Sequence, residues 1–70
     1  MKQQIIDRVN SATTPFDKRR EIENIAYSLA GPCQVTSRQV LLTALTGKQY
    51  PKAKAGVHEI IKAIKELTTP

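Results

Sequence analysis

Apolar side chains recur along this 70-residue chain at the three- and four-residue spacing of amphipathic helices, in four separate segments. Polar or turn-forming residues separate the segments, and no stretch shows the regular alternation of a half-buried strand. The pattern therefore predicts an all-α fold in which residues 1–70 form a single domain. Four helices are expected, over about residues 2–12, 15–30, 37–46 and 52–67.

The second segment carries the clearest boundary signals. Thr14 can cap a helix N-terminus with its side-chain oxygen, and Pro15 has the backbone angle that suits the first helical position. Asp17 places a carboxylate in the first turn, where the helix dipole favours it. Gly31 and Pro32 predict the end of this helix, because glycine suits a left-handed cap and proline cannot continue a helix.

The third and fourth segments are marked by other signals. Thr36 and Gln39 have the spacing of a capping box, which predicts the start of the third helix, and Gly47 predicts its end. The fourth segment follows Tyr50 and Pro51 and has the strongest periodic apolar series in the chain. We expect Tyr50 to cover the turn before this last helix.

The apolar stripes define the expected core. Phe16 lies off the stripe of the second helix, and we expect it to reach back and pack on the first. The first helix carries more apolar surface than a three-helix core needs, which suggests a homodimer through that helix. The core is expected to contain Ile5, Ile6, Val9, Ala12, Ile22, Ile25, Ala26, Leu29, Val40, Leu41, Ala44, Leu45, Ala53, Val57, Ile60, Ile61, Ile64 and Leu67.

Composition narrows the function. The chain has no set of nucleophile and base with supporting residues and no glycine-rich phosphate loop, so we expect neither an enzyme nor a cofactor site. Cys33 and His58 are the sole residues of their kinds and lie far apart in sequence, so no metal site is predicted. A single cysteine, no apolar leader and no apolar run of membrane-spanning length predict a cytoplasmic protein.

The charge distribution points to a polyanionic partner. The net charge is +5, and residues 38–70 hold six basic but only two acidic side chains. A small basic domain with its charge gathered in one half has the electrostatic character of a nucleic-acid-binding protein. The other basic run, Lys18-Arg19-Arg20, is flanked by carboxylates, and we expect it to be a solvated helix face.

The cationic side chains of the fourth segment are also ordered. At about 100° per residue, Lys54, His58, Lys62 and Lys65 share one face of a continuous helix, opposite the apolar face. Glu59 and Glu66 fall between the two faces, and Lys48 and Lys52 would extend the basic region from the preceding turn. A helix that lies against a phosphate backbone needs such a face.

The order of the segments carries a resemblance. Ile25–Pro32 ends one helix, Val35–Val40 opens the next, and Lys54–Ile64 forms a long basic helix. This order resembles the helix-turn-helix core of winged-helix transcription regulators over about residues 20–68. The turn from Gly47 to Lys52 is longer than the usual tight turn of that family, and no wing hairpin is expected in these 70 residues. The resemblance implies a small double-stranded-DNA-binding regulator of transcription or replication, of the kind that phages, plasmids or compact genomes encode.

The resemblance also implies which residues meet the nucleic acid. The start of the last helix, from Lys52 to His58, would lie nearest the base edges, and Lys62 and Lys65 would meet phosphates. The N-terminus of the third helix would contact the backbone through its free amides. The expected nucleic-acid-binding residues are Ser37, Arg38, Lys48, Lys52, Lys54, Ala55, His58, Lys62 and Lys65.

Two alternatives remain open at this point. In a second register, the third helix itself is the recognition helix and reads bases with Ser37, Arg38 and Gln39. In a different class of function, the chain is an adaptor or inhibitor that docks on an acidic surface of a larger enzyme, and its lysines steer that association. RNA binding is a third option, although the chain has few aromatic side chains for base stacking.

Overall fold

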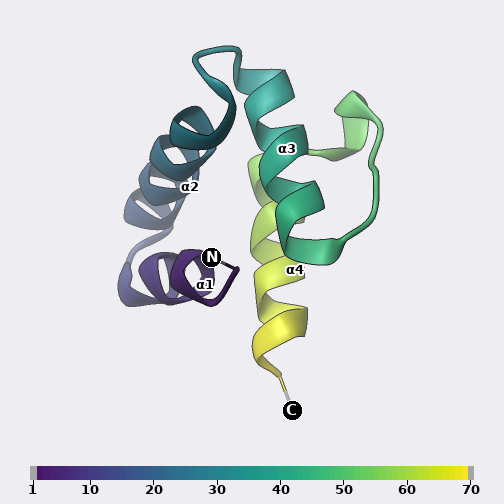
Figure 1. Cartoon of the computed structure of the whole chain (residues 1–70). Helices are drawn as coiled ribbons and strands as arrows, with labels where there is room; N and C mark the ends of the chain where they lie inside the picture. The colour runs from purple at the N-terminus through teal and green to yellow at the C-terminus, as the bar shows by residue number, and fades with distance from the viewer. Residues whose placement is uncertain (1, 70) are drawn as a thin grey trace.

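The computed structural model describes residues 2–69 and shows four α-helices and one 3₁₀ turn in this range (Figure 1). Helix α1 spans Lys2–Ser11, α2 spans Pro15–Ala30, α3 spans Gln34–Thr46 and α4 spans Val57–Thr68. The 3₁₀ turn η1 covers Lys52–Lys54. No strand occurs within residues 2–69, which confirms the prediction of a compact all-α fold of four helices.

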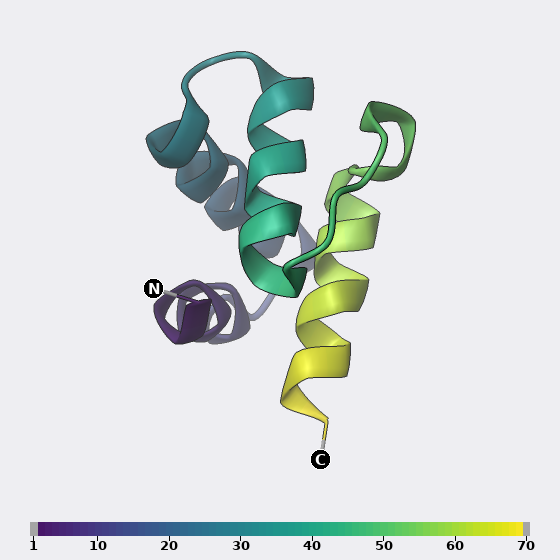
Figure 2. The same ribbon diagram turned by 45° about the vertical axis from the view of Figure 1, so that its right-hand side comes forward.

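Helix α2 lies at the centre of the packing and contacts the other three helices. Figures 1 and 2 show α1 running across one end of the α2–α3 pair, while α4 packs alongside α3. The long connection from α3 to α4 bulges outward on the side away from α1 and α2 (Figure 2). This arrangement leaves the connection and one side of α4 open to solvent.

Two of the predicted helix boundaries are confirmed in detail. The Thr14 hydroxyl oxygen accepts a hydrogen bond from the backbone N–H of Asp17 at 3.1 Å, as an N-cap does. Gly47 ends α3 in the left-handed conformation, with φ of 73°, where a side chain would be strained. Gly31 also has a positive φ of 86°, but its ψ of −171° differs from that of a left-handed helical cap.

The core draws apolar side chains from all four helices and from Ala55 in the connection. Most of the predicted core is confirmed, including Ile22, Leu41 and Ile60, which are fully buried. Several expectations were wrong, and two of them concern the first turn of α2 and the last turn of α4. Phe16 is 71% exposed and so does not pack on α1, and Leu67, in the last turn of α4, is 39% exposed. The buried residues are Ile5, Ile6, Val9, Ile22, Ile25, Ala26, Leu41, Leu42, Leu45, Ala55, Ile60, Ala63 and Ile64.

The apolar side chains of α1 are used within the chain itself. Ile5, Ile6 and Val9 are at most 4% exposed because they pack into the common core. The sequence argument for a homodimer through this helix relied on surplus apolar surface on these residues. Because they are buried within the chain, they provide no apolar surface for a second copy.

Helix α3 begins three residues earlier than the capping-box pattern predicted. Its N-cap is Cys33, which forms no side-chain cap, and Thr36 lies inside the first turn. Ser37 is fully buried, and its hydroxyl donates a hydrogen bond to the Gly31 carbonyl. This bond satisfies a carbonyl at the end of α2. The turn between α2 and α3 is thus only three residues long, and α3 starts at Gln34 rather than at the predicted residue 37.

The early start of α3 is accompanied by a different buried face. Ser37, Leu41 and Leu45 follow one another at four-residue spacing and point into the core with Leu42. Val40 and Ala44, which were expected to be buried, are instead exposed.

The fourth predicted helix is interrupted. Lys52–Lys54 form a separate 3₁₀ turn, Ala55 is buried, and Gly56 has extended backbone angles that start α4 only at Val57. Ala53 is exposed rather than buried. Glycine has a low helix propensity, so a continuous helix through Gly56 would be unfavourable.

Candidate nucleic-acid interface

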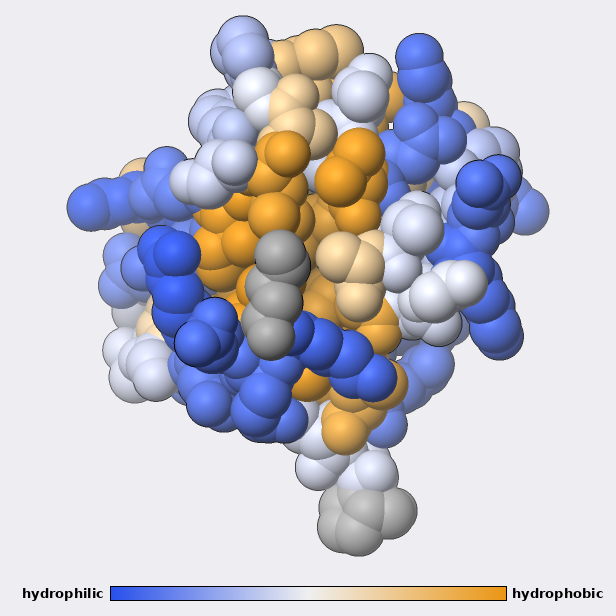
Figure 3. Space-filling view, in the orientation of Figure 1, coloured by the Kyte–Doolittle hydropathy of each residue, from blue (hydrophilic) through white to orange (hydrophobic). Residues whose placement is uncertain are grey.

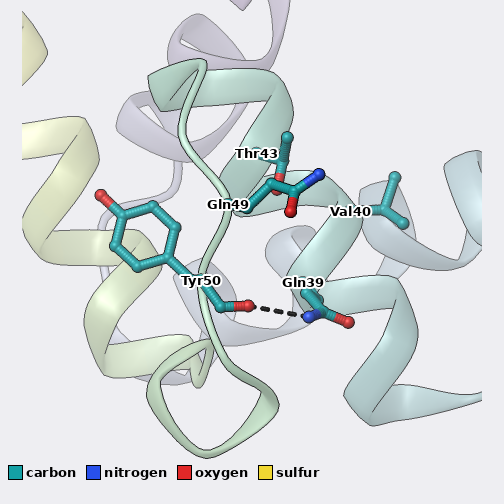
Figure 4. A pocket seen from close by; sticks show the side chains of 5 residues that line it. All are labelled: Gln39, Val40, Thr43, Gln49 and Tyr50. Atoms are coloured by element: carbon teal, nitrogen blue, oxygen red, sulfur yellow. Dashed lines mark hydrogen bonds between the residues drawn. The ribbon is translucent and has the colours of Figure 1, made fainter.

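The connection between α3 and α4, residues 47–56, is tied to the body of the protein at two points. The side-chain amide of Gln39 on α3 donates a hydrogen bond from Nε2 to the Tyr50 carbonyl at 2.7 Å (Figure 4). Tyr50 is partly buried against the core, and Ala55 is 2% exposed. The residues between these anchors form η1, with the Lys54 N–H donating to the Pro51 carbonyl at 2.9 Å.

Five lysines lie on this connection and on α4, and we call them the lysine surface: Lys48, Lys52, Lys54, Lys62 and Lys65. All five are exposed. None of their ammonium groups forms an ion pair or a hydrogen bond with another side chain or carbonyl of residues 2–33 and 35–69. Their charge is therefore available to an external anion.

Most of the other basic side chains are bound within the protein. Arg8 pairs with Glu21 at 2.7 Å, and Arg19 and Arg38 both reach Glu23 at 3.3 Å. Three of the four arginines thus have a carboxylate partner. Lys18 donates from Nζ to the carbonyl of Val9 at 3.1 Å. Four of the six cations on α1–α3 thus have an internal partner, whereas none of the five lysines on the connection and α4 has one within residues 2–33 and 35–69.

The structure buries two residues of the predicted binding set and pairs a third with a carboxylate. Ser37 is fully buried and Ala55 is 2% exposed, so neither side chain reaches a ligand on the surface. The Arg38 side chain is only 19% exposed, and Glu23, fifteen positions earlier, holds its guanidinium. The expectations for Ser37 and Ala55 are therefore corrected, because both side chains are buried, whereas a DNA contact by Arg38 stays a prediction.

We expect Glu23→Gln to lower the free energy of unfolding by about 1 to 2 kcal/mol. The change removes the carboxylate from two arginines, of which Arg38 is mostly buried and already has an unpaired Nε within the described residues. Urea unfolding followed by circular dichroism measures the effect. Arg19→Ala is the control, because it breaks the more exposed pair alone and should cost less. Equal losses for the two variants would contradict a structural role for the Arg38 contact.

The basic face of α4 differs from its predicted form. His58, Lys62 and Lys65 are exposed at spacings that share a helix face, but Lys54 lies on η1 and does not continue that face. Lys62 lines a shallow hollow together with Glu59 and Glu66. Three of the five unpaired lysines therefore lie on the connection, and two lie on α4.

A second hollow adjoins the connection and was not anticipated from the sequence. Gln39, Val40, Thr43, Gln49 and Tyr50 line it (Figure 4). The picture shows Gln49 lying over α3 near Thr43, while the Tyr50 ring points to the opposite side of the chain. Gln39 was expected to cap α3, so its bond to Tyr50 corrects that expectation.

The Cys33 thiol lies at the start of α3 and is exposed. A hydrogen bond with the Thr36 side chain, helped by the nearby charge of Lys52, lowers the pKa of this thiol below its ordinary value. Within residues 2–69 no three metal-ligating side chains come together. No helix in the same range is long and apolar enough to cross a bilayer.

No family model, curated protein or solved structure matches this chain. The resemblance to winged-helix regulators therefore stays a prediction, and the distribution of unpaired charge is the strongest functional indication.

Proposed function

We propose that this chain binds double-stranded DNA through the lysine surface. The observation that carries the proposal is the distribution of partners among the cations: the five lysines of the connection and α4 have no protein partner in residues 2–33 and 35–69, whereas three of the four arginines do. Unpaired lysines on an exposed surface can neutralise backbone phosphates and release condensed counterions, which is the main source of non-specific DNA affinity.

The shape of this surface suits a duplex better than a small ligand. Lys48, Lys52 and Lys54 lie along the outward connection, and Lys62 and Lys65 follow on the adjoining helix. Phosphate contacts of this kind position a protein on DNA without reading its sequence. His58, in the first turn of α4, is the side chain that we place nearest the base edges. A role in regulating transcription or replication, as the helix-turn-helix resemblance implies, is part of this proposal.

Docking on an acidic protein is the second candidate. Exposed apolar side chains favour it, because Val35 and Val40 on α3 are 44% and 39% exposed. Figure 3 also shows apolar surface gathered between the helices on the face that it displays. Protein interfaces depend on a few well-packed apolar or aromatic side chains, whereas a phosphate interface depends on charge. The two candidates therefore predict different sensitive residues.

The test is fluorescence anisotropy with a labelled random-sequence duplex, comparing single alanine variants at low salt. Lys52→Ala and Lys62→Ala should each weaken binding and reduce the slope of log K against log salt by about 0.9. Arg20→Ala is the matched control, since Arg20 is exposed on α2 and its loss changes the net charge equally. We expect it to leave the slope unchanged.

Two results would overturn this proposal. Equal losses for all three variants would mean that net charge, rather than the lysine surface, attracts the duplex. Binding that responds to Val40→Ala but to no lysine would favour the protein-docking candidate.

A further inference from the structure

The α3–α4 connection has a fixed course, although ten residues separate the two helices. A chain segment of this length would ordinarily lose considerable conformational entropy when it is ordered on a ligand. Here the Gln39 amide holds the Tyr50 carbonyl at 2.7 Å, and that bond comes from α3, eleven positions earlier. The connection is therefore ordered by the fold itself.

The position of this bond relative to the lysines is informative. Lys48 precedes Tyr50 by two residues and Lys52 follows it by two, so the anchored carbonyl lies midway between them. Both lysine side chains are exposed, while Tyr50 is partly buried against the core. Fixing the backbone at Tyr50 thus limits where the two ammonium groups can reach.

We infer that Gln39 is a positioning residue for DNA binding: its bond to Tyr50 holds the lysines of the connection where they can contact the phosphate backbone. This inference rests on the proposed function. Gln39 acts through the Tyr50 carbonyl, to which its Nε2 donates, and not through a contact of its own with phosphate. Its contribution is preorganisation, since a connection that is already ordered loses less entropy when its lysines bind.

The chain offers a matched control in the same hollow. Gln49 lies beside Gln39, is exposed, and its side chain has no hydrogen-bond partner in residues 2–69. Gln39→Met and Gln49→Met make the same chemical change, but only the first removes an anchor of the connection. Thermal melts should show both variants folded, because the core residues are untouched.

The experiment is a double-mutant cycle on duplex affinity at low salt. Gln39→Met should weaken binding by about twofold to tenfold, the effect of losing one ordinary hydrogen bond, and Gln49→Met should have no effect. In a chain that also carries Lys48→Ala, Lys52→Ala and Lys54→Ala, Gln39→Met should cost nothing further, because the lysines that it positions are gone. In a chain that carries Lys62→Ala and Lys65→Ala, its full effect should persist.

A second readout needs no DNA. The amides of Lys54 and Ala55 are hydrogen-bonded within the connection, at 2.9 and 3.4 Å. Gln39→Met should accelerate their hydrogen exchange by about twofold to tenfold, and Gln49→Met should not.

Each remaining result has a definite meaning. If Gln39→Met weakens binding equally with and without the three lysines of the connection, Gln39 acts through general stability and the inference is wrong. The inference also fails if Gln39→Met leaves the affinity unchanged while the wild-type chain binds DNA, whatever its effect on hydrogen exchange. Absence of binding by the wild-type chain would instead overturn the proposed function, and the positioning role with it.

Discussion

Replacing Leu42 with alanine is expected to lower the free energy of unfolding by about 2 to 5 kcal/mol. Leu42 is 1% exposed and belongs to the core, so its truncation removes apolar burial and leaves a cavity. A chain of 70 residues has a total stability of about 3.5 to 10 kcal/mol at typical values per residue. This single change should therefore unfold a substantial part of the population under mild denaturant.

The control for this prediction is two residues away. Val40 is 39% exposed, and Val40→Ala should cost less than about 1 kcal/mol. Urea unfolding followed by circular dichroism compares the two variants directly. The sequence pattern placed Val40 in the core and did not include Leu42 among the core residues. A larger loss for Val40→Ala than for Leu42→Ala would show that α3 faces the core as the pattern predicted.

Helix α3 illustrates how far the sequence determines this fold. The four helices could be predicted because apolar spacing and turn residues are local signals. The buried face of α3 could not be predicted, because Val40, Leu41 and Leu42 are consecutive apolar residues that fit two adjacent apolar stripes. The choice between the stripes depends on Ser37, whose buried hydroxyl bonds the Gly31 carbonyl across the turn. That contact is tertiary and leaves no periodic signal.

The second large effect concerns salt. If all five lysines of the lysine surface contact phosphates, the slope of log K against log salt should be about −4.5. Raising salt from about 50 to about 200 mM should then weaken binding by about 500-fold. The large factor arises because each contact releases a condensed counterion, and the free energy of that release falls as salt rises.

Alanine at all five positions provides the comparison. The remaining arginines are mostly paired with carboxylates, so the substituted chain should bind weakly and with a slope near zero. Anisotropy titrations at several salt concentrations measure both slopes. The result against this prediction is a steep slope that survives in the five-alanine variant, because other cations would then make the contacts.

The candidate site could be predicted in part. The lysines were identifiable because the charge is concentrated in the C-terminal half of the sequence. The sequence did not show which cations are unpaired, because ion pairs can join different helices, as Arg38 on α3 and Glu23 on α2 do. The role of Gln39 was also hidden, because its bond to Tyr50 crosses from α3 to the connection and competes with the capping role that local spacing suggested.

The most direct test of the central claim is an amide chemical-shift titration of the labelled chain with a short random-sequence duplex. The lysine surface predicts that shifts concentrate in residues 48–54 and on the exposed side of α4 around His58, Lys62 and Lys65, with α1 and most of α2 unchanged. Shifts centred on Val35 and Val40, or on α1 and α2, would contradict binding through the lysine surface.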